Sequence, residues 1–225
     1  MYPFTLPSGQ TCALRELTGV EEELLTNPRL LRTGEALNQV LRNCLVQLDD
    51  QAEVTARDVL DLLAGDRLFL LVKLRQISLG DEVMLSLICP NSGCQTTNMV
   101  PVNLEDLPVT PYPAEREFAT ALPGSGVTVR FVPLDGHKEV RLAALPEADL
   151  THAMLIRILE IDGAPPTKKS VTALSMKDRQ ALRAAMLATD GGIETTITTT
   201  CRRCGTPLAT RVEGDPAFFF PPARP

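Results

Sequence analysis

The chain has 225 residues, a formal net charge of −6 and a sequence pI near 5.1. This length allows one large domain or two small ones, and the apolar content of 44% is ordinary for a globular protein. The acidic balance argues against nucleic acid as the main partner, because duplex binders usually present a basic face. No apolar run is long enough to span a bilayer and the N-terminus does not resemble a signal peptide, so we expect no membrane segment and synthesis in a reducing cytoplasm.

Residues 1–81 predict an N-terminal part of one strand followed by helices. In the predicted helix at Glu35–Leu48 apolar residues recur at three- and four-residue spacing, and the predicted helix at Arg67–Leu79 is apolar on most of its circumference. We expect these two helices to pack together, with the last as the central buried helix and Asp66 as its cap. The expected elements, in chain order, are a strand at Thr11–Leu17, a short helix after Thr18, an amphipathic helix at Glu35–Leu48, a turn or two of helix at Thr55–Leu63 and a helix at Arg67–Leu79.

Two cysteine pairs each lie at a turn between strand-like runs. Residues 82–105 predict a hairpin around the first pair, spaced C-x4-C, and residues 193–214 predict another around the second, spaced C-x2-C. Two such knuckles can place four thiolates at the corners of one tetrahedron around a structural zinc, as in a zinc ribbon. The predicted zinc ligands are Cys89, Cys94, Cys201 and Cys204.

Other states of these thiols remain open from the sequence. The pairs can be two reduced dithiols or two disulfides, and a C-x2-C can also be a redox pair, although the flanking strand and turn residues do not match that motif. Arg202 and Arg203, inside the second knuckle, would partly offset the charge of a four-thiolate zinc site. Because more than a hundred residues separate the pairs, a shared metal makes the segment between them an insertion.

Residues 106–192 predict this inserted α/β segment, which begins with a proline-rich linker. Its expected elements are a strand at Val127–Val132 and helices at Glu147–Ile161 and Met176–Thr189, the last capped by Ser175. The fold class expected for the whole chain is therefore α+β. It combines an N-terminal helical part, a zinc-ribbon-like hairpin module closed by distant chain segments, and an α/β insertion.

Residues 215–225 form a phenylalanine- and proline-rich tail with two interpretations. The rings of Phe218, Phe219 and Phe220 either pack onto the chain's own core or act as a docking peptide that places aromatic anchors in a partner. We take partner binding as the functional hypothesis for these three residues.

The sequence contains no motif of a known catalytic centre. Neither His137 nor His152 lies in a metalloprotease or nucleophile motif, and no phosphate-binding Gly-Lys-Ser/Thr follows Gly124–Gly126. We expect no enzymatic activity and no small-molecule substrate.

The order of several segments resembles the T4-type baseplate hub family of contractile-tailed phages and contractile injection systems. The segments that carry the resemblance are Leu6–Gly9, Thr18–Leu25, Gly65–Leu71 and Leu74–Asp81, followed by the first cysteine pair. The resemblance covers residues 6–104 best and thins between about residues 110 and 190. It rests on order, since no single motif is specific, and the C-x4-C spacing departs from the commoner C-x2-C of zinc ribbons.

The resemblance implies a structural or assembly (chaperone-like) protein of the baseplate hub, whose partners are other baseplate proteins. It would be found in the cytoplasm of the producing bacterial cell, and retention in the finished virion or injection particle is left open. An alternative function is a zinc-ribbon adaptor acting on nucleic acid or on the transcription machinery. The acidic pI counts against this alternative.

Overall fold

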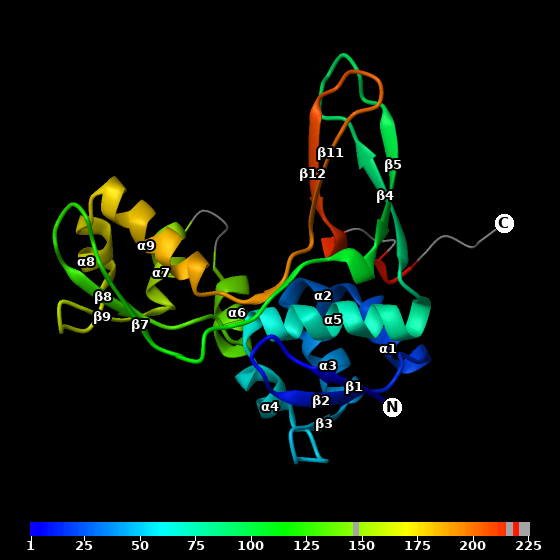
Figure 1. Cartoon of the computed structure of the whole chain (residues 1–225), viewed down its shortest axis with the longest axis horizontal. Coiled ribbons are helices and arrows are strands. Elements are labelled where there is room, and N and C mark those ends of the chain that lie inside the picture. Colours follow the sequence, from blue (N-terminus) through cyan, green and yellow to red (C-terminus); the bar gives the residue numbers. More distant parts are fainter. Residues whose placement is uncertain (146–148, 215–217, 221–225) are drawn as a thin grey trace.

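A computed structural model describes residues 1–145, 149–214 and 218–220. The fold is α+β, as predicted, with helices and several small antiparallel sheets. Figure 1 shows three regions: a body (residues 1–81), an upright arm of two hairpins (residues 83–104 and 195–212) and a lobe to one side (residues 114–190). Within the described residues, no helix combines the length and apolar character needed to cross a membrane.

The body packs five helices against a three-stranded sheet. Helix α5 (Ala64–Leu79) lies between the sheet and the base of the arm, and Leu70, Val72 and Leu74 are fully buried in it (Figure 1). The prediction of a central buried helix is therefore confirmed. The other elements are β1 (Tyr2–Thr5), β2 (Thr11–Leu14), β3 (Leu45–Leu48), α1 (Gly19–Leu25), α2 (Pro28–Thr33), α3 (Glu35–Cys44) and α4 (Ala56–Asp61).

The start of α5 differs from what the sequence predicts, whereas its end at Gly80 is as predicted and holds the arm. The helix begins at Ala64, so Asp66 lies inside its first turn, where its Oδ1 accepts a hydrogen bond from Ser8 N at 2.9 Å. At the other end Gly80 takes a φ of +86° and ends the helix. The buried Arg75 guanidinium donates to the carbonyls of Gly80 and Glu82, which ties the helix end to the first strand of the arm.

The predicted helix Glu35–Leu48 is wrong in its last turn. Helix α3 ends at Cys44, and β3 follows directly and pairs antiparallel with β2. Leu45 and Leu48 are buried in the strand, and their three-residue spacing also fits one face of a helix, so apolar spacing does not distinguish a strand from a helix here. The strand is favoured because it satisfies the backbone groups of β2 on the side away from β1.

The arm consists of two β-hairpins whose inner faces are apolar. In the first hairpin β4 (Glu82–Ile88) pairs with β5 (Thr97–Asn103), and in the second β11 (Thr196–Thr200) pairs with β12 (Pro207–Arg211). Short 3-10 turns, η1 (Leu104–Asp106) and η2 (Val212–Gly214), lie at the base. The inward side chains at the base continue the core of the body: Val83, Leu85, Val102, Leu104 and Val212.

The lobe has a core of its own. It contains a sheet of β7 (Phe118–Ala121), β8 (Thr128–Phe131) and β9 (Ile158–Ile161), with α7 (Leu150–Leu155), α8 (Lys168–Ala173) and α9 (Met176–Ala188). Helix α6 (Gly136–Ala143) belongs to the same stretch of chain but packs on α4 and α5 of the body, where Glu139 pairs with Arg67. Ser175 caps α9, as predicted, by accepting a hydrogen bond from Asp178 N. The buried core of the lobe consists of Leu122, Val129, Phe131, Met154, Ile158, Val171, Leu182 and Met186.

The predicted helix Glu147–Ile161 is wrong. Only α7 is helical, and β9 then completes the sheet by pairing with β8, while Glu147 lies outside the described residues. The apolar residues between 150 and 161 belong to two different elements. The second part forms a strand because pairing with the free edge of β8 satisfies the backbone hydrogen-bonding groups of both strands.

The chain leaves for the lobe and returns from it side by side. Strand β6 (Val109–Thr110) pairs with β10 (Gly192–Ile193), so both connections meet beside the start of α5. The contact is so close that a Cβ on Gly65 would lie 2.2 Å from the carbonyl oxygen of Gly191. The pairing of β6 with β10 therefore brings the second hairpin back next to the first.

Candidate metal centre

The two knuckles at the tip of the arm bring the four predicted cysteines together. Their sulfur atoms all lie within 4.8 Å of one another. Two of the sulfur pairs join one knuckle to the other: Cys89 Sγ lies 3.6 Å from Cys204 Sγ, and Cys94 Sγ lies 3.7 Å from Cys201 Sγ. Residues more than a hundred positions apart in the sequence therefore form one cluster that could hold a metal ion.

The spacing of the sulfur atoms fits a tetrahedral four-thiolate site. A zinc–sulfur distance of about 2.3 Å corresponds to sulfur–sulfur separations of about 3.8 Å along the edges of a tetrahedron. A disulfide requires about 2.05 Å, and all six cysteines are free. The donor chemistry also fits, because zinc prefers thiolates and a set of four cysteines is common in structural zinc sites.

Both knuckles close in the same way after their second cysteine. Gln95 and Gly205, which follow the second cysteine, take a positive φ of +46° and +73°. The next residue in each knuckle then hydrogen-bonds to the first cysteine of the same knuckle. Cys89 N donates to the carbonyl of residue 96 at 3.0 Å, as Cys201 N does to that of residue 206 at 2.8 Å. The hydroxyl oxygens of Thr96 and Thr206 lie 3.3 and 3.1 Å from the sulfurs of residues 94 and 204.

The two additional residues of the first knuckle therefore lie between its cysteines. Asn91 organises this longer loop, since its side-chain oxygen accepts from Gly93 N at 2.9 Å and its carbonyl accepts from Cys94 N at 2.8 Å. The unusual C-x4-C spacing thus preserves the geometry of the ligands.

Asn98 on β5 joins the two hairpins beside the cluster, a role that the sequence analysis missed. It is almost fully buried; its side-chain nitrogen lies 3.6 Å from Cys201 Sγ and its oxygen accepts from Arg202 N at 2.9 Å. A polar residue on the same strand face as Val100 and Val102 was the available signal. Side chains that hydrogen-bond to metal ligands orient them and tune their basicity.

The thiols of the cluster differ in acidity because their surroundings differ. Backbone N–H groups of Arg203 and Cys204 lower the pKa of Cys201 to about 6, and the Thr206 hydroxyl lowers the pKa of Cys204. Burial raises the pKa of Cys89 to about 11. A bound divalent cation deprotonates such thiols and lowers all of these values.

The comparisons with known proteins place the chain in a family. A family model described as T4 bacteriophage base plate protein matches residues 1–220. The chain belongs to this family. The match extends through the lobe, where the sequence resemblance was weak. No match was found among curated proteins or among solved structures.

The structure divides the three phenylalanines of the tail. Phe218 is fully buried in the core shared by body and arm, and its ring meets the Phe219 ring edge to face at 4.7 Å between centroids. Phe220 is 42% exposed and lines, with Phe219, Leu17 and Leu79, a hollow of about 470 Å³. Phe218 is thus a core residue, Phe219 is partly buried and packs against the same core, and Phe220 is exposed.

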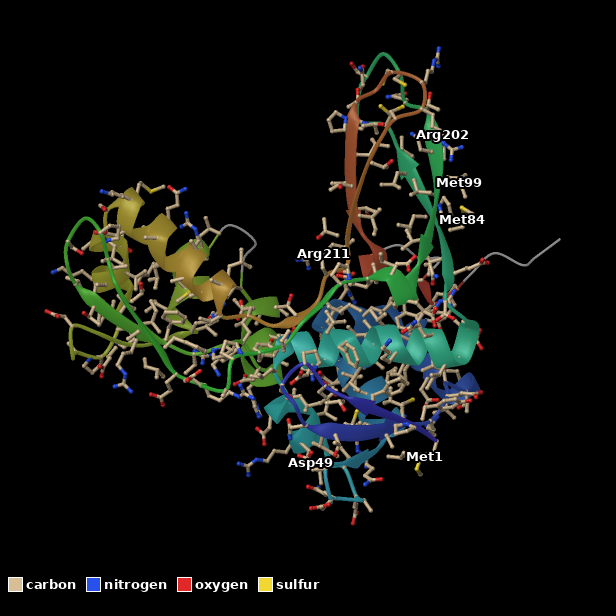
Figure 2. The ribbon with its side chains drawn as sticks, viewed as in Figure 1. Met1, Asp49, Met84, Met99, Arg202 and Arg211 are labelled. Atoms are coloured by element: carbon tan, nitrogen blue, oxygen red, sulfur yellow. The ribbon has the colours of Figure 1, made fainter. Side chains whose placement is uncertain are left out.

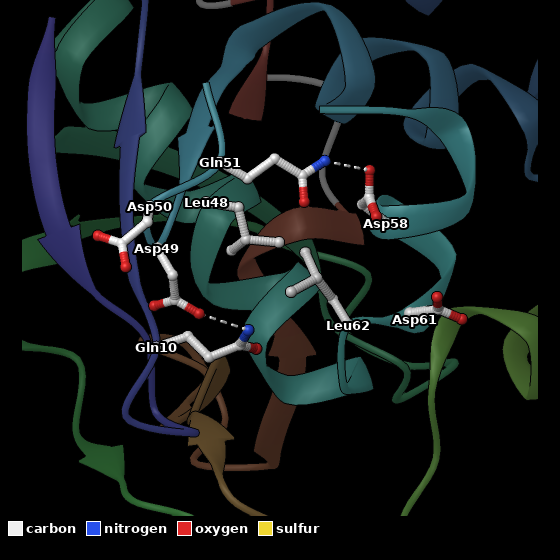
Figure 3. Close-up of a pocket in the computed structure, with 8 residues that line it drawn as sticks. All are labelled: Gln10, Leu48, Asp49, Asp50, Gln51, Asp58, Asp61 and Leu62. Carbon is white, nitrogen blue, oxygen red and sulfur yellow. Dashed lines mark hydrogen bonds between the residues drawn. The ribbon is translucent and has the colours of Figure 1, made fainter. Parts of the chain in front are cut away.

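A second hollow of the body, of about 410 Å³, is lined by Asp49, Asp50, Asp58 and Asp61 (Figure 3). Two of its carboxylates, those of Asp49 and Asp58, hold turns and a helix cap. Asp49 accepts hydrogen bonds from Gln10 and from Thr11 N, and Asp58 accepts from Gln51 and from the backbone N–H of Thr55, the N-cap of α4. This hollow is therefore explained by turn and cap formation.

Proposed function

We propose that this member of the baseplate family is a non-enzymatic structural or assembly protein of the baseplate hub. The observation that carries the proposal is the family match over residues 1–220. In this role the protein binds other baseplate proteins, and its fold positions contact surfaces instead of a reactive centre.

We further propose one structural zinc ion held by Cys89, Cys94, Cys201 and Cys204. The proposal is supported by the tetrahedral spacing of the sulfurs and by the shared knuckle geometry. With four protein ligands the metal has no open position for a substrate, so it stabilises the arm and takes no part in chemistry.

We also propose that residues 106–192 are an α/β unit inserted into the zinc-ribbon-like module (82–105 and 193–214), which follows the N-terminal part (1–81) and precedes the tail (215–225). The separate apolar core of the lobe supports the insertion, whereas the N-terminal part and the base of the ribbon-like module share one core. Rapid proteolytic release of a stable lobe fragment is expected, and cleavage spread evenly along the chain would contradict the division.

Two measurements test the proposed function. Elemental analysis of protein purified without added metal should find about one zinc per chain. Each purified baseplate protein encoded beside this chain is then tested singly for binding, with duplex DNA as the comparison for the adaptor alternative. Binding to DNA alone, with no baseplate protein bound, would reject the hub role, whereas mass spectrometry of purified particles decides between a resident component and an assembly factor.

A further inference from the structure

The arm is unlike the rest of the surface in its charges. Residues 83–104 and 195–212 contain no aspartate or glutamate, and all 28 acidic residues lie elsewhere in the chain. The charged residues of the arm are Arg202, Arg203 and Arg211. Arg211 faces Glu213 at the base at 3.7 Å, while within the described residues no carboxylate pairs with the two arginines at the tip.

The outer face of the first hairpin carries an exposed apolar stripe. Met84 and Met99 are each 43% exposed and Ile88 is 69% exposed, although the inner face of the same strands is buried. The register pairs Met84 with Pro101 and Ser86 with Met99, which makes the two methionines diagonal neighbours. Figure 2 shows Arg202, Met99 and Met84 in succession along one side of the arm.

The arginine at the tip is part of the same stripe. The Arg202 guanidinium donates a hydrogen bond to the Met99 carbonyl oxygen at 2.9 Å, so its charge is held at the upper end of the apolar residues. The outer face of the second hairpin differs, because it presents small residues such as Thr198 and Ala209.

This composition is typical of a surface that becomes covered. Solvent-facing strands of two-stranded ribbons are normally protected by charged side chains, which prevent adventitious pairing and aggregation. Protein interfaces, in contrast, are depleted of acidic residues and enriched in methionine and arginine. Methionine side chains also adapt to the shape of a partner.

We propose that the outer face of the β4–β5 hairpin, from Arg202 at the tip to Met84 near the base, is the docking surface for another baseplate protein. The partner presents an apolar groove for the methionines and Ile88, with carboxylates beside the tip arginines. Charge complementarity selects this chemistry, since residues 83–104 and 195–212 contain no acidic residue, while acidic residues flank them at the base of the arm and are frequent in the rest of the chain. This inference rests on the proposed hub function and assigns its contact surface.

The test compares two matched double variants of the full-length protein. Met84→Glu/Met99→Glu places two carboxylates on the first hairpin, and Thr198→Glu/Ala209→Glu places two on the second. The probe is each purified baseplate protein encoded beside this chain, titrated singly by calorimetry. We expect the first variant to lose affinity by at least about tenfold, as for interface anchors, and the second to bind like wild type. Zinc content and melting temperature of both variants check that the arm is folded.

A charge variant tests the tip. Arg202→Glu should weaken binding to the same partner, and Arg202→Lys should retain most of the affinity. The loss of affinity caused by Arg202→Glu should grow as the salt concentration is lowered, because charges are then screened less. Wild-type affinity in Met84→Glu/Met99→Glu, or equal losses in both double variants, would overturn the docking surface. So would finding that the stripe variants abolish only self-association or only DNA binding.

The outcomes also separate this inference from the function on which it rests. If no baseplate protein binds the wild-type chain, the hub proposal fails. If one binds and the stripe variants bind it equally well, the hub proposal stands and the docking surface is elsewhere.

Discussion

Replacement of Phe218 by alanine should destabilise the whole fold. The ring is fully buried in the core that joins the body to the base of the arm, and it packs edge to face on Phe219. Truncating a buried phenylalanine costs about 3–5 kcal/mol, which includes the aromatic pair of about 0.5–1.5 kcal/mol. This loss is a large fraction of the roughly 5–15 kcal/mol that stabilises a typical domain.

The matched control is Phe220→Ala, because this ring is 42% exposed. Exposed positions usually change the free energy of unfolding by less than about 0.5 kcal/mol. Both proteins would be unfolded in guanidinium chloride, followed by circular dichroism, and the free energies of unfolding compared with wild type.

A Phe218→Ala protein as stable as Phe220→Ala would refute the core assignment and restore the hypothesis of a docking peptide formed by all three rings. If Phe220→Ala keeps wild-type stability but binds a baseplate protein more weakly, the exposed end of the tail adds a second contact.

Three other perturbations address the metal centre and the body. Cys201→Ser should abolish zinc binding and unfold the arm, since structural zinc sites contribute on the order of 10 kcal/mol, whereas Cys12→Ser should keep its zinc in elemental analysis; equal zinc in both would contradict the assignment. Asn98→Ala should release zinc to a chelator at about 10–100-fold lower chelator concentration, and unchanged resistance would remove its supporting role. Burial opposes ionisation of Glu21, but hydrogen bonds from Arg15 and its neighbours lower its pKa to about 2 from the ordinary 4.5. The contribution of Glu21 to the free energy of unfolding is therefore complete above pH 4.5 and is lost as the pH falls toward 2. In Glu21→Gln the free energy of unfolding, measured at a series of pH values, should fall less steeply between pH 4.5 and 2 than in the wild type. An unchanged fall would show that other carboxylates control acid stability.

The ligand set of the candidate metal centre could be predicted from the sequence because its signals are local. Each cysteine pair lies in a short turn whose geometry depends on neighbouring residues, and Gly205 supplies the positive φ that closes the second knuckle. The buried helix α5 could be predicted for a similar reason, since sixteen residues without proline and with apolar side chains on most faces specify a core helix.

Other features were decided by contacts between distant segments. Leu45–Leu48 and Ile158–Ile161 form strands because the edges of β2 and β8 need partners for their backbone groups, which apolar spacing cannot reveal. The alternation of β5 marks Asn98 as an inward-facing polar residue, but its role depends on the second hairpin, which places Cys201 and Arg202 beside it.

The sequence by itself therefore determined which residues can bind a metal and which helix is buried, because these depend on the chemistry and spacing of near neighbours. The tertiary structure brings together two knuckles more than a hundred residues apart, and the pairing of β6 with β10 returns the chain to the arm. It also decided that Phe218 faces inward and Met84 outward, because burial depends on which surfaces the rest of the chain covers.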